Sequence, residues 1–327
     1  MIRATFCLLL AASAAVAADP PRPADLDPKT VAAYEKLGAE HGHLYVSDLG
    51  YLRFQEAKSK TRLPPDAVPA FRFRKVPAGP LPPVEGSFGL DFTQAPMTDA
   101  DLEHVARLEG VTALGLANTR LSDDGLAHVA KLARLATLDL TRTAVTDRGM
   151  EPLAKLGALT TLLIDGTNVT DKGVIQVAKV ESLKLLEPGK KKITDNLVAA
   201  LVEAGRLHIL AQARTLKGRA DDDKEINILI LPGTPVTDKG LEHIAKLGGL
   251  TGLHLNATAV TDKGMEHVGK IPTLITLELA QTGITDAGLE HLAKLSKLYT
   301  LDLTKTKVTN PAVLKFRKAV PKCIVLR

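Results

Sequence analysis

The chain has 327 residues, of which 45% are hydrophobic and 24% charged, and this composition is typical of a folded protein rather than a disordered or membrane-embedded one. The formal net charge of +5 is spread along the chain, whereas nucleic-acid-binding proteins concentrate basic residues on one face, so a nucleic-acid partner is not expected. After the first residues, no stretch approaches the roughly 18 consecutive apolar residues of a membrane-spanning helix, so we expect a soluble mature protein.

The first residues predict export. Arg3 precedes an apolar run that ends in the small-residue pattern Ala15-Val16-Ala17, which is typical of a cleavable secretory signal over residues 1–18. The run is not amphipathic, which disfavours a buried N-terminal helix. We therefore expect a periplasmic, extracellular or cell-surface protein. Its mature form has one cysteine, Cys323, and so no intramolecular disulfide.

Residues 19–87 differ in composition from the rest and predict an N-terminal cap. Asp27-Pro28 opens an expected short helix through about Gly38, and residues 43–55 read as a hairpin that turns near Asp48 to Gly50. The proline-rich stretch 64–83 predicts an extended segment along the end of the domain or a linker. Eight of the eleven aromatic residues lie between Tyr34 and Phe92, and we expect them to form the core of this cap.

A periodic array occupies residues 88–310. A Thr-Asp or Ser-Asp pair recurs every 24 residues, and after one interval of 43 residues the spacing resumes, with Asn310 in the next slot. The aspartates of these pairs are Asp99, Asp123, Asp147, Asp171, Asp195, Asp238, Asp262 and Asp286. The long interval equals one full unit plus one shortened to 19 residues, so the array is predicted to be continuous and irregular around residues 196–227.

The unit that begins at Leu250 follows the pattern L-x-x-L-x-L-x-x-T-x-V and then T-D-x-G, and here the chain resembles the leucine-rich repeat family. It looks most like the cysteine-containing subtype found in F-box proteins, with Thr where that subtype carries Cys or Asn, although no F-box region is found. The resemblance implies a right-handed α/β solenoid, a curved horseshoe with a parallel sheet on the concave face and helices on the convex face. Ten strands spaced by ~4.8 Å would make a sheet on the order of 45 Å long.

Each repeated position has a physical interpretation. One threonine column, represented by Thr258, follows the strands, where its hydroxyls are expected to bond backbone groups of the adjacent coil. The Thr-Asp pair is predicted to cap the following helix. A histidine also recurs on the helix flank, but successive helices are about 10 Å apart, too far for one shared zinc ion. The histidines are His104, His128, His243, His267 and His291.

The irregular region and the C-terminal end complete the array. Between the strands expected near Leu210 and Leu229 there is no room for a helix of normal length, so a loop is predicted on the convex side. Asp221 to Asp223 are adjacent rather than alternating and do not match a calcium loop. Residues 311–327, with a helix over 313–319 and a strand over 324–326, predict a C-terminal cap.

The concave face is the predicted binding surface, because the repeat fixes which strand residues point toward it. Most are small or polar, but an apolar group falls in the middle, and we interpret this group, with its acidic surround, as an exposed hot spot. The alternative is that the irregular coil covers these residues or shifts their register. The candidate binding residues are Leu163, Leu185, Ile209, Ile228, Ile230, Asp139, Asp165, His254, Glu278 and Asp302.

These observations favour a non-catalytic scaffold that binds a protein through its concave face. The sequence contains no G-x-S-x-G, H-E-x-x-H or phosphate-binding loop motif, so we predict no catalytic residue, metal or cofactor. Two alternatives stay open: a glycan-binding module, which would normally use concave aromatic residues, and a hydrolase with its site in the N-terminal cap, built from His41, His43 and Asp48. The oligomeric state and the partner's identity are not predicted.

Overall fold

The computed structural model describes residues 26–47, 50–216 and 218–327. In chain order, the first elements are α1 (Pro28–Lys36), β1 (Ala39–Val46), β2 (Leu52–Glu56), β3 (Val68–Phe73), β4 (Phe88–Asp91), α2 (Leu102–Val105), β5 (Val111–Gly115), α3 (Asp123–Val129), β6 (Thr137–Asp139), α4 (Asp147–Leu153), β7 (Thr161–Leu163), α5 (Asp171–Val177) and β8 (Leu185–Glu187). They are followed by η1 (Lys190–Lys192), α6 (Asp195–Glu203), η2 (Leu207–Ile209), β9 (Ala213–Thr215), β10 (Gly218–Arg219), η3 (Asp223–Glu225), β11 (Ile228–Ile230), α7 (Asp238–Ile244), β12 (Gly252–His254), α8 (Asp262–Val268), β13 (Thr276–Glu278), α9 (Asp286–Leu292), β14 (Thr300–Asp302), α10 (Asn310–Ala319) and β15 (Ile324–Leu326). The predicted signal peptide lies outside the described residues.

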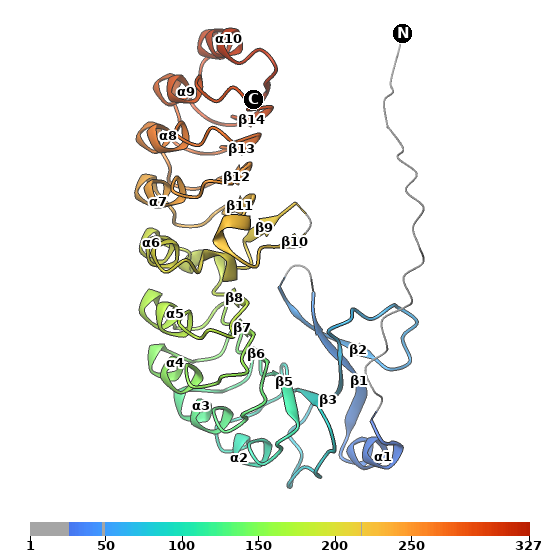
Figure 1. Ribbon diagram of the computed structural model, residues 1–327. Helices are drawn as coiled ribbons and strands as arrows, with labels where there is room; N and C mark the ends of the chain where they lie inside the picture. The colour runs from blue at the N-terminus through green and yellow to red at the C-terminus, as the bar shows by residue number, and fades with distance from the viewer. Residues whose placement is uncertain (1–25, 48–49, 217) are drawn as a thin grey trace.

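From β4 onward the chain forms a curved solenoid with strands on the concave side and helices on the convex side (Figure 1). The leucines of each strand point into one core that is continuous from Tyr34 near the N-terminus to Val325 in β15. No single coil could bury its own apolar face, so the stack is the cooperative unit. This is the predicted α/β solenoid. No helix in the described part of the chain is long and apolar enough to cross a membrane.

The strands form two sheets instead of the one expected. The first has the order β2-β1-β3-β4-β5-β6-β7-β8 and the second has the order β10-β9-β11-β12-β13-β14-β15. At the position of the missing repeat strand, the described chain forms only an isolated parallel bridge between Leu186 and Leu210. The prediction of ten paired strands in a row was therefore wrong at this coil, where η2 replaces a strand.

The threonine column is confirmed as a set of buried hydroxyls that bond backbone carbonyls. The Oγ1 of Thr258 donates to the carbonyl oxygen of Leu255 at 2.6 Å, and Thr119 does the same to Leu116 at 2.6 Å. The acceptor lies three residues earlier in the same coil, not in the adjacent coil as predicted. Each bond therefore closes the turn of its own coil at the end of the strand.

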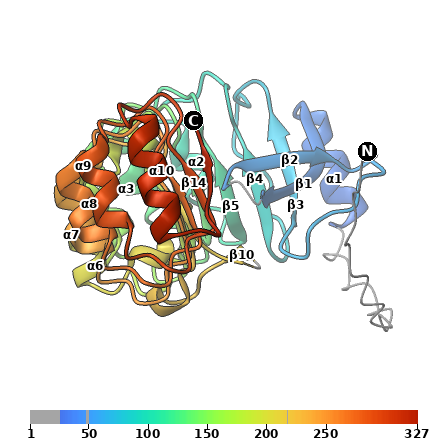
Figure 2. The same ribbon diagram turned by 90° about the horizontal axis from the view of Figure 1, so that it is seen from above.

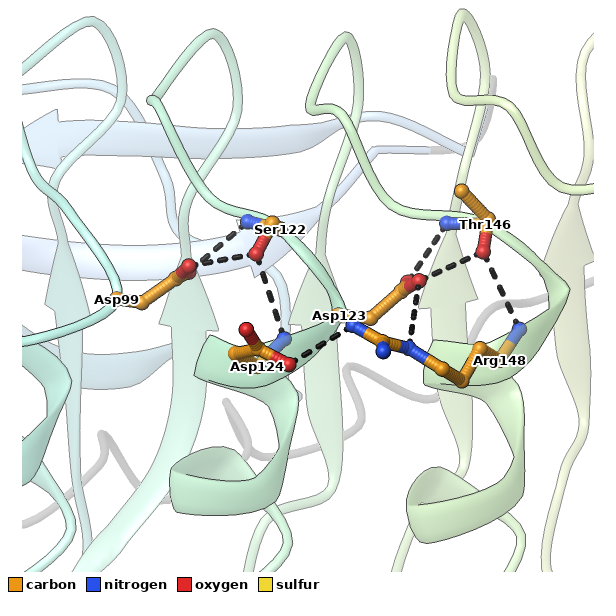
Figure 3. Close-up of polar contacts among 6 residues, drawn as sticks. All are labelled: Asp99, Ser122, Asp123, Asp124, Thr146 and Arg148. Carbon is orange, nitrogen blue, oxygen red and sulfur yellow. Dashed lines mark hydrogen bonds and ion pairs between the residues drawn. The ribbon is translucent and has the colours of Figure 1, made fainter.

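The Thr-Asp pair links successive coils, a role that the sequence analysis missed. The Asp123 carboxylate accepts hydrogen bonds from the Thr146 amide at 2.8 Å and the Thr146 hydroxyl at 2.6 Å, one coil further along (Figure 3). The Thr146 hydroxyl in turn accepts from the amide of Arg148 and caps α4. The same Asp–Thr or Asp–Ser link runs along the array, for the pairs Asp99–Ser122, Asp123–Thr146, Asp147–Thr170, Asp171–Thr194, Asp195–Thr237, Asp238–Thr261, Asp262–Thr285 and Asp286–Thr309.

In six of the eight coils, the glycine two residues after the linking aspartate makes room for the carboxylate of the preceding link. A Cβ atom built on Gly149 would lie 2.6 Å from Oδ1 of Asp123, and one on Gly264 would lie 2.4 Å from Oδ1 of Asp238. Carbon and oxygen atoms cannot approach this closely without a shift of the backbone. The T-D-x-G pattern therefore encodes an inter-coil link together with the space that it needs.

The shortened unit interrupts the strands but not the helices. Asp195 in α6 bonds the amide of Thr237, at 2.8 Å, across 42 residues, so the link passes directly to the coil of α7. The intervening chain forms the β9–β10 hairpin, which projects on the concave side (Figure 1). The prediction of a loop on the convex side was wrong, because the helical layer closes over the gap and leaves the extra residues only the strand side.

The N-terminal region extends the first sheet. β1 pairs antiparallel with both β2 and β3, and β3 pairs in parallel with β4, so the proline-rich stretch contributes a strand to the sheet. The expected helix and hairpin both form, although Asp48 lies outside the described residues. Tyr34 stacks on Phe71 with ring centroids 4.0 Å apart, and this aromatic group is continuous with the core of the array. Seen along the solenoid, the β1–β2 hairpin lies on the opposite side of the strands from the helices (Figure 2).

Candidate functional site: the concave face

Strand register places the concave side chains in two columns. In the first sheet, Asp91, Gly115, Asp139, Leu163 and Glu187 lie side by side on successive strands. In the second sheet, the equivalent column runs Ile230, His254, Glu278, Asp302 and Leu326. Side chains that alternate along a strand point to opposite faces, so both columns face away from the leucine core.

Two of the predicted apolar residues, Leu163 and Leu185, are on the concave side but are not exposed. Leu163 and Leu185 are 2% and 1% exposed, and they form a cluster with Ala211 that Val46 and Leu52 cover. We call Leu163, Leu185 and Ala211 the concave apolar patch. The prediction of an exposed hot spot was wrong for Leu163 and Leu185, because the chain's own β1–β2 hairpin lies over them.

Ile209 is not a concave residue. It lies in η2, is fully buried, and belongs to the leucine core, because the shortened unit turns through a 3₁₀ helix here instead of a strand. Ile228 and Ile230 do lie on the concave side of β11 and are half-buried. Of the five predicted apolar residues, these two alone remain accessible.

Small residues on the first strands fit the hairpin above them. A Cβ atom on Gly89 would lie 2.8 Å from Cδ1 of Leu44, and one on Gly115 would lie 3.1 Å from Cδ2 of Leu52. The column of Gly115 carries Asp139 one coil later, and the column of Gly89 carries Ala113 and then Thr137. The same change from Gly to Thr occurs between Gly252 and Thr276 on the uncovered second sheet, so it is not by itself a sequence signal for a covering segment.

The predicted acidic residues have unlike environments. Asp139 is 7% exposed, and burial raises the pKa of its carboxyl, with the nearby charge of Asp91 acting in the same direction. Asp91 itself is paired with Arg72 at 2.7 Å, and the Arg72 guanidinium lies 4.0 Å from the centre of the Phe54 ring. Asp165 is exposed. Of the two predicted first-sheet acids, Asp139 and Asp165, only Asp165 is therefore open to a partner.

The second sheet keeps an accessible polar column. Glu278 lies 3.4 Å from Nδ1 of His254 and accepts a hydrogen bond from the Asn256 side chain at 2.7 Å. Asp302 accepts from the amide of Thr304 at 2.9 Å. The side chains of His254 and Glu278 are 26% and 31% exposed, so this group is held in place and yet reaches the solvent.

Two polar residues at the break were missed. The Gln212 amide donates to Glu187 at 2.9 Å, and burial raises the pKa of Glu187. Gln212 sits just before β9, where the repeat pattern gives no register. No sequence signal pointed to it, because the pairing depends on how the shortened unit folds.

The described histidine and acidic side chains do not form a metal-binding group. No group of three or more His, Cys, Asp or Glu side chains within residues 26–47, 50–216 and 218–327 is placed to hold a metal ion. His208 contacts Asp223 at 2.7 Å through Nδ1, and the His208 amide bonds the same oxygen, so this pair fastens η3 to η2. His41 and His43 share β1 with ring centroids 6.4 Å apart.

Comparison with known proteins agrees with the repeat geometry. The family model described as Leucine Rich repeat matches residues 135–154 and 270–293. Those two segments match leucine-rich repeats. No curated protein matches the whole sequence significantly.

Three solved structures of bacterial proteins are similar to part of the chain. An internalin (inlF) from Listeria monocytogenes is 17% identical with a TM-score of 0.44, over 73% of this chain and 79% of that one. A leucine-rich repeat protein of Leptospira interrogans is 18% identical with a TM-score of 0.44, over 73% of this chain and 60% of that one. Internalin C2 of Listeria monocytogenes is 23% identical with a TM-score of 0.40, over 70% of this chain and 83% of that one. At this identity the likeness concerns the fold alone.

Proposed function

We propose that this chain is an exported, non-catalytic scaffold that binds a protein through the concave face of its second sheet. The proposal rests on the contrast between the two halves of the whole concave face, one formed by the first sheet and the other by the second. The first half is covered by the β1–β2 hairpin, whereas Ile228, Ile230, His254, Glu278 and Asp302 in the second half are only half-buried.

The accessible half combines the two features that protein partners use. Ile228 and Ile230 offer aliphatic surface at one end, and Glu278 and Asp302 offer carboxylates along the next strands. His254 and Asn256 fix the orientation of Glu278, so little side-chain entropy is lost when a partner binds. The chemistry suits a protein surface with aliphatic and cationic groups.

The proposal includes export of the chain and membership of its repeats in one leucine-rich repeat subtype. The signal pattern of residues 1–18 supports delivery to the periplasm, cell surface or exterior. The T-D-x-G-L continuation supports the cysteine-containing repeat subtype, with threonine in the ladder position. No catalytic role is assigned to any residue, and no nucleic acid is proposed as a partner.

A glycan is the second candidate ligand. Tyr299 is 54% exposed and lies beside Ile275, which is 45% exposed, at the entry to β14 and β13. An exposed aromatic ring can stack on a sugar. The ring does not belong to either concave column, so the candidate ranks below a protein partner.

Chemical crosslinking in an extract of the cells that make this protein tests the proposal. The experiment compares the wild-type mature chain with two variants. The variant Glu278→Lys/Asp302→Lys reverses the charge of the accessible face, and the matched control Glu242→Lys/Glu266→Lys makes the same charge change on the convex helices. We expect the control to capture the same protein as the wild type and the concave variant to lose it. Equal capture by both variants would exclude this half of the face, and loss on competition with soluble cell-wall glycan would favour the second candidate.

A further inference from the structure

The net charge of the chain is concentrated at its C-terminal end, and is not spread evenly as predicted. Residues 294–327 contain nine lysine and arginine residues and one acid, Asp302. This segment carries a net side-chain charge of +8, so the residues before it carry −3 of the total of +5. The basic residues are all exposed, and they are Lys294, Lys297, Lys305, Lys307, Lys315, Arg317, Lys318, Lys322 and Arg327.

Exposed apolar side chains gather at the same end of the molecule. Of the eight large apolar side chains that are exposed in the described part of the chain, five lie at or beyond Ile275. Three of these five, Leu314, Ile324 and Leu326, belong to α10 and β15, which form the last coil. An exposed apolar group bordered by charged residues marks an interaction surface.

One side of α10 faces outward from the end of the array. Lys315 and Ala319 line a groove between α10 and α9, so this side of the helix faces the preceding coil. Residues three and four apart share a helix face, so Leu314, Arg317 and Lys318 lie together on another side, which points away from α9. Figure 2 looks onto this end of the solenoid, with α10 in front.

The last strand continues the surface of α10. Val325 is buried, whereas Ile324 and Leu326 alternate with it and are 49% and 48% exposed. β15 is the last strand of its sheet, and Nη2 of Arg317 lies 3.5 Å from the carbonyl oxygen of Val325. The helix and the strand therefore form one surface. We call Leu314, Arg317, Lys318, Lys322, Ile324 and Leu326 the terminal face.

Protection of the end of the array explains only part of this surface. Lysine and arginine beside an edge strand discourage pairing with other chains. A terminal coil of a repeat protein also needs a polar outer side for solubility. Leu314, Ile324 and Leu326 serve neither purpose, because polar side chains at these positions would protect the end better. The exposed aliphatic side chains therefore require a partner.

The combination of cations and aliphatic side chains fits an anionic lipid surface. Lipid phosphates attract the lysine and arginine side chains, while aliphatic side chains enter the boundary between headgroups and acyl chains. A second copy of this chain is disfavoured, because two terminal faces would bring like charges together. A nucleic acid would use the cations but would leave Leu314, Ile324 and Leu326 without apolar contacts.

We propose that the terminal face docks on the surface of a lipid bilayer that contains anionic lipids. The proposal goes beyond protein binding on the concave face, because it concerns another surface and another class of partner. Docking through the last coil leaves Ile230, His254 and Glu278, on β11 to β13, free for a protein. Vesicle binding also does not depend on export, so the two proposals can fail separately.

The test measures co-sedimentation of the mature chain with vesicles of phosphatidylglycerol and phosphatidylcholine in equal parts, compared with vesicles of phosphatidylcholine alone. Arg317→Gln/Lys318→Gln removes two charges from the terminal face. Its matched control, Lys131→Gln/Lys155→Gln, makes the same charge change at exposed residues in the middle of the array. Leu314→Gln removes an aliphatic side chain, and its control is Leu37→Gln, at a residue 39% exposed just after α1. Circular dichroism checks that each variant is folded.

We expect the wild type and both controls to bind the anionic vesicles and not phosphatidylcholine alone. Arg317→Gln/Lys318→Gln should weaken binding about 30-fold. Leu314→Gln should weaken it about ten-fold. Raising the salt concentration from about 0.1 M to about 0.5 M should also weaken wild-type binding. Absence of wild-type binding to the anionic vesicles, or equal binding by the two double variants, would overturn the proposal.

A single tryptophan gives a second measurement, because the chain has none. On anionic vesicles, the emission of Leu314→Trp should shift to shorter wavelength as the indole enters the interface, and that of Leu37→Trp should not. An unchanged emission of Leu314→Trp would contradict the proposal. Wild-type binding to a DNA duplex without binding to the vesicles would assign the terminal face to nucleic acid and overturn it as well.

Discussion

The Asp–Thr links predict a specific loss of stability when one of them is cut. Asp238 accepts hydrogen bonds from the Thr261 amide at 2.7 Å and the Thr261 hydroxyl at 2.6 Å. Thr261 makes no side-chain capping bond to α8, unlike the other threonines that precede helices, so Thr261→Val removes the hydroxyl bond of the link, and leaves the amide bond, without removing a cap. Asp238→Ala removes the acceptor of both bonds.

The expected magnitudes follow from the kind of bond and its exposure. A hydrogen bond to a charged group contributes about 1.5–3 kcal/mol when buried, and this link is solvent-accessible, so the lower end applies. We expect Thr261→Val to cost about 1 kcal/mol. Asp238→Ala should cost about 2 kcal/mol, because it also removes a carboxylate from the N-terminus of α7. The coupling energy between the two changes should be about 1 kcal/mol.

Equilibrium urea unfolding of the wild type, both single variants and the double variant, followed by far-ultraviolet circular dichroism, gives these values. Repeat arrays can lose cooperativity, so coincidence of the circular dichroism and tyrosine fluorescence transitions is checked first. Asp221→Ala, in the exposed loop before η3, is the control and should change stability by less than about 0.5 kcal/mol. A Thr261→Val cost no larger than that of the control, or a coupling near zero, would refute a stabilising role for the links.

Three further outcomes are expected. Gly240→Ala, whose Cβ would lie 2.5 Å from Oδ1 of Asp195, should destabilise the chain by about 2 kcal/mol, whereas Gly248→Ala, with no atom within 4 Å, should not, and urea unfolding compares them. Burial acts to raise the pKa of Asp123, but the hydrogen bonds from Thr146 outweigh burial and lower this pKa below the ordinary 3.8. The Asp123 carboxylate therefore stabilises the fold fully above pH 3.8, and this contribution is lost as the pH falls through the lower pKa of the folded state. Melting temperatures that stay constant between pH 6 and pH 2 would contradict this prediction. Burial raises the pKa of the Cys323 thiol to about 11, so iodoacetamide at pH 8 should label it only after unfolding, as mass spectrometry would show.

Local periodicity predicted the solenoid because each repeat uses the same few interactions. The 24-residue spacing, the alternating leucines and the Thr-Asp pairs fixed strands, helices and the inward-facing residues, and the structure agrees at Leu253, Leu255 and Leu241. The links between coils could also have been predicted from the sequence. A carboxylate, a hydroxyl and a glycine that recur together in register indicate a contact between neighbours, and not only a helix cap.

The cover over the concave patch was harder to predict, because it depends on packing between residues more than a hundred positions apart. Val46 meets Leu163 and Leu185 only after the first sheet has curled the β1–β2 hairpin over the array. The hairpin was predicted, but its position was not. Gly89 and Gly115 gave no separate hint, because Gly252 occupies the same kind of column on the uncovered second sheet.

The shortened unit explains why the β1–β2 hairpin and the irregular coil meet at the centre of the concave face. Its helix is absent, and the link from Asp195 to Thr237 joins α6 to α7 directly, so the remaining residues are displaced to the concave side as η2 and the β9–β10 hairpin. Ala211 then meets the tip of the β1–β2 hairpin. Together they close the middle of the face and leave β11 to β15 open, a length of about 20 Å at ~4.8 Å per strand. A partner that binds the concave face therefore has less than half of the surface that the repeat number alone would suggest.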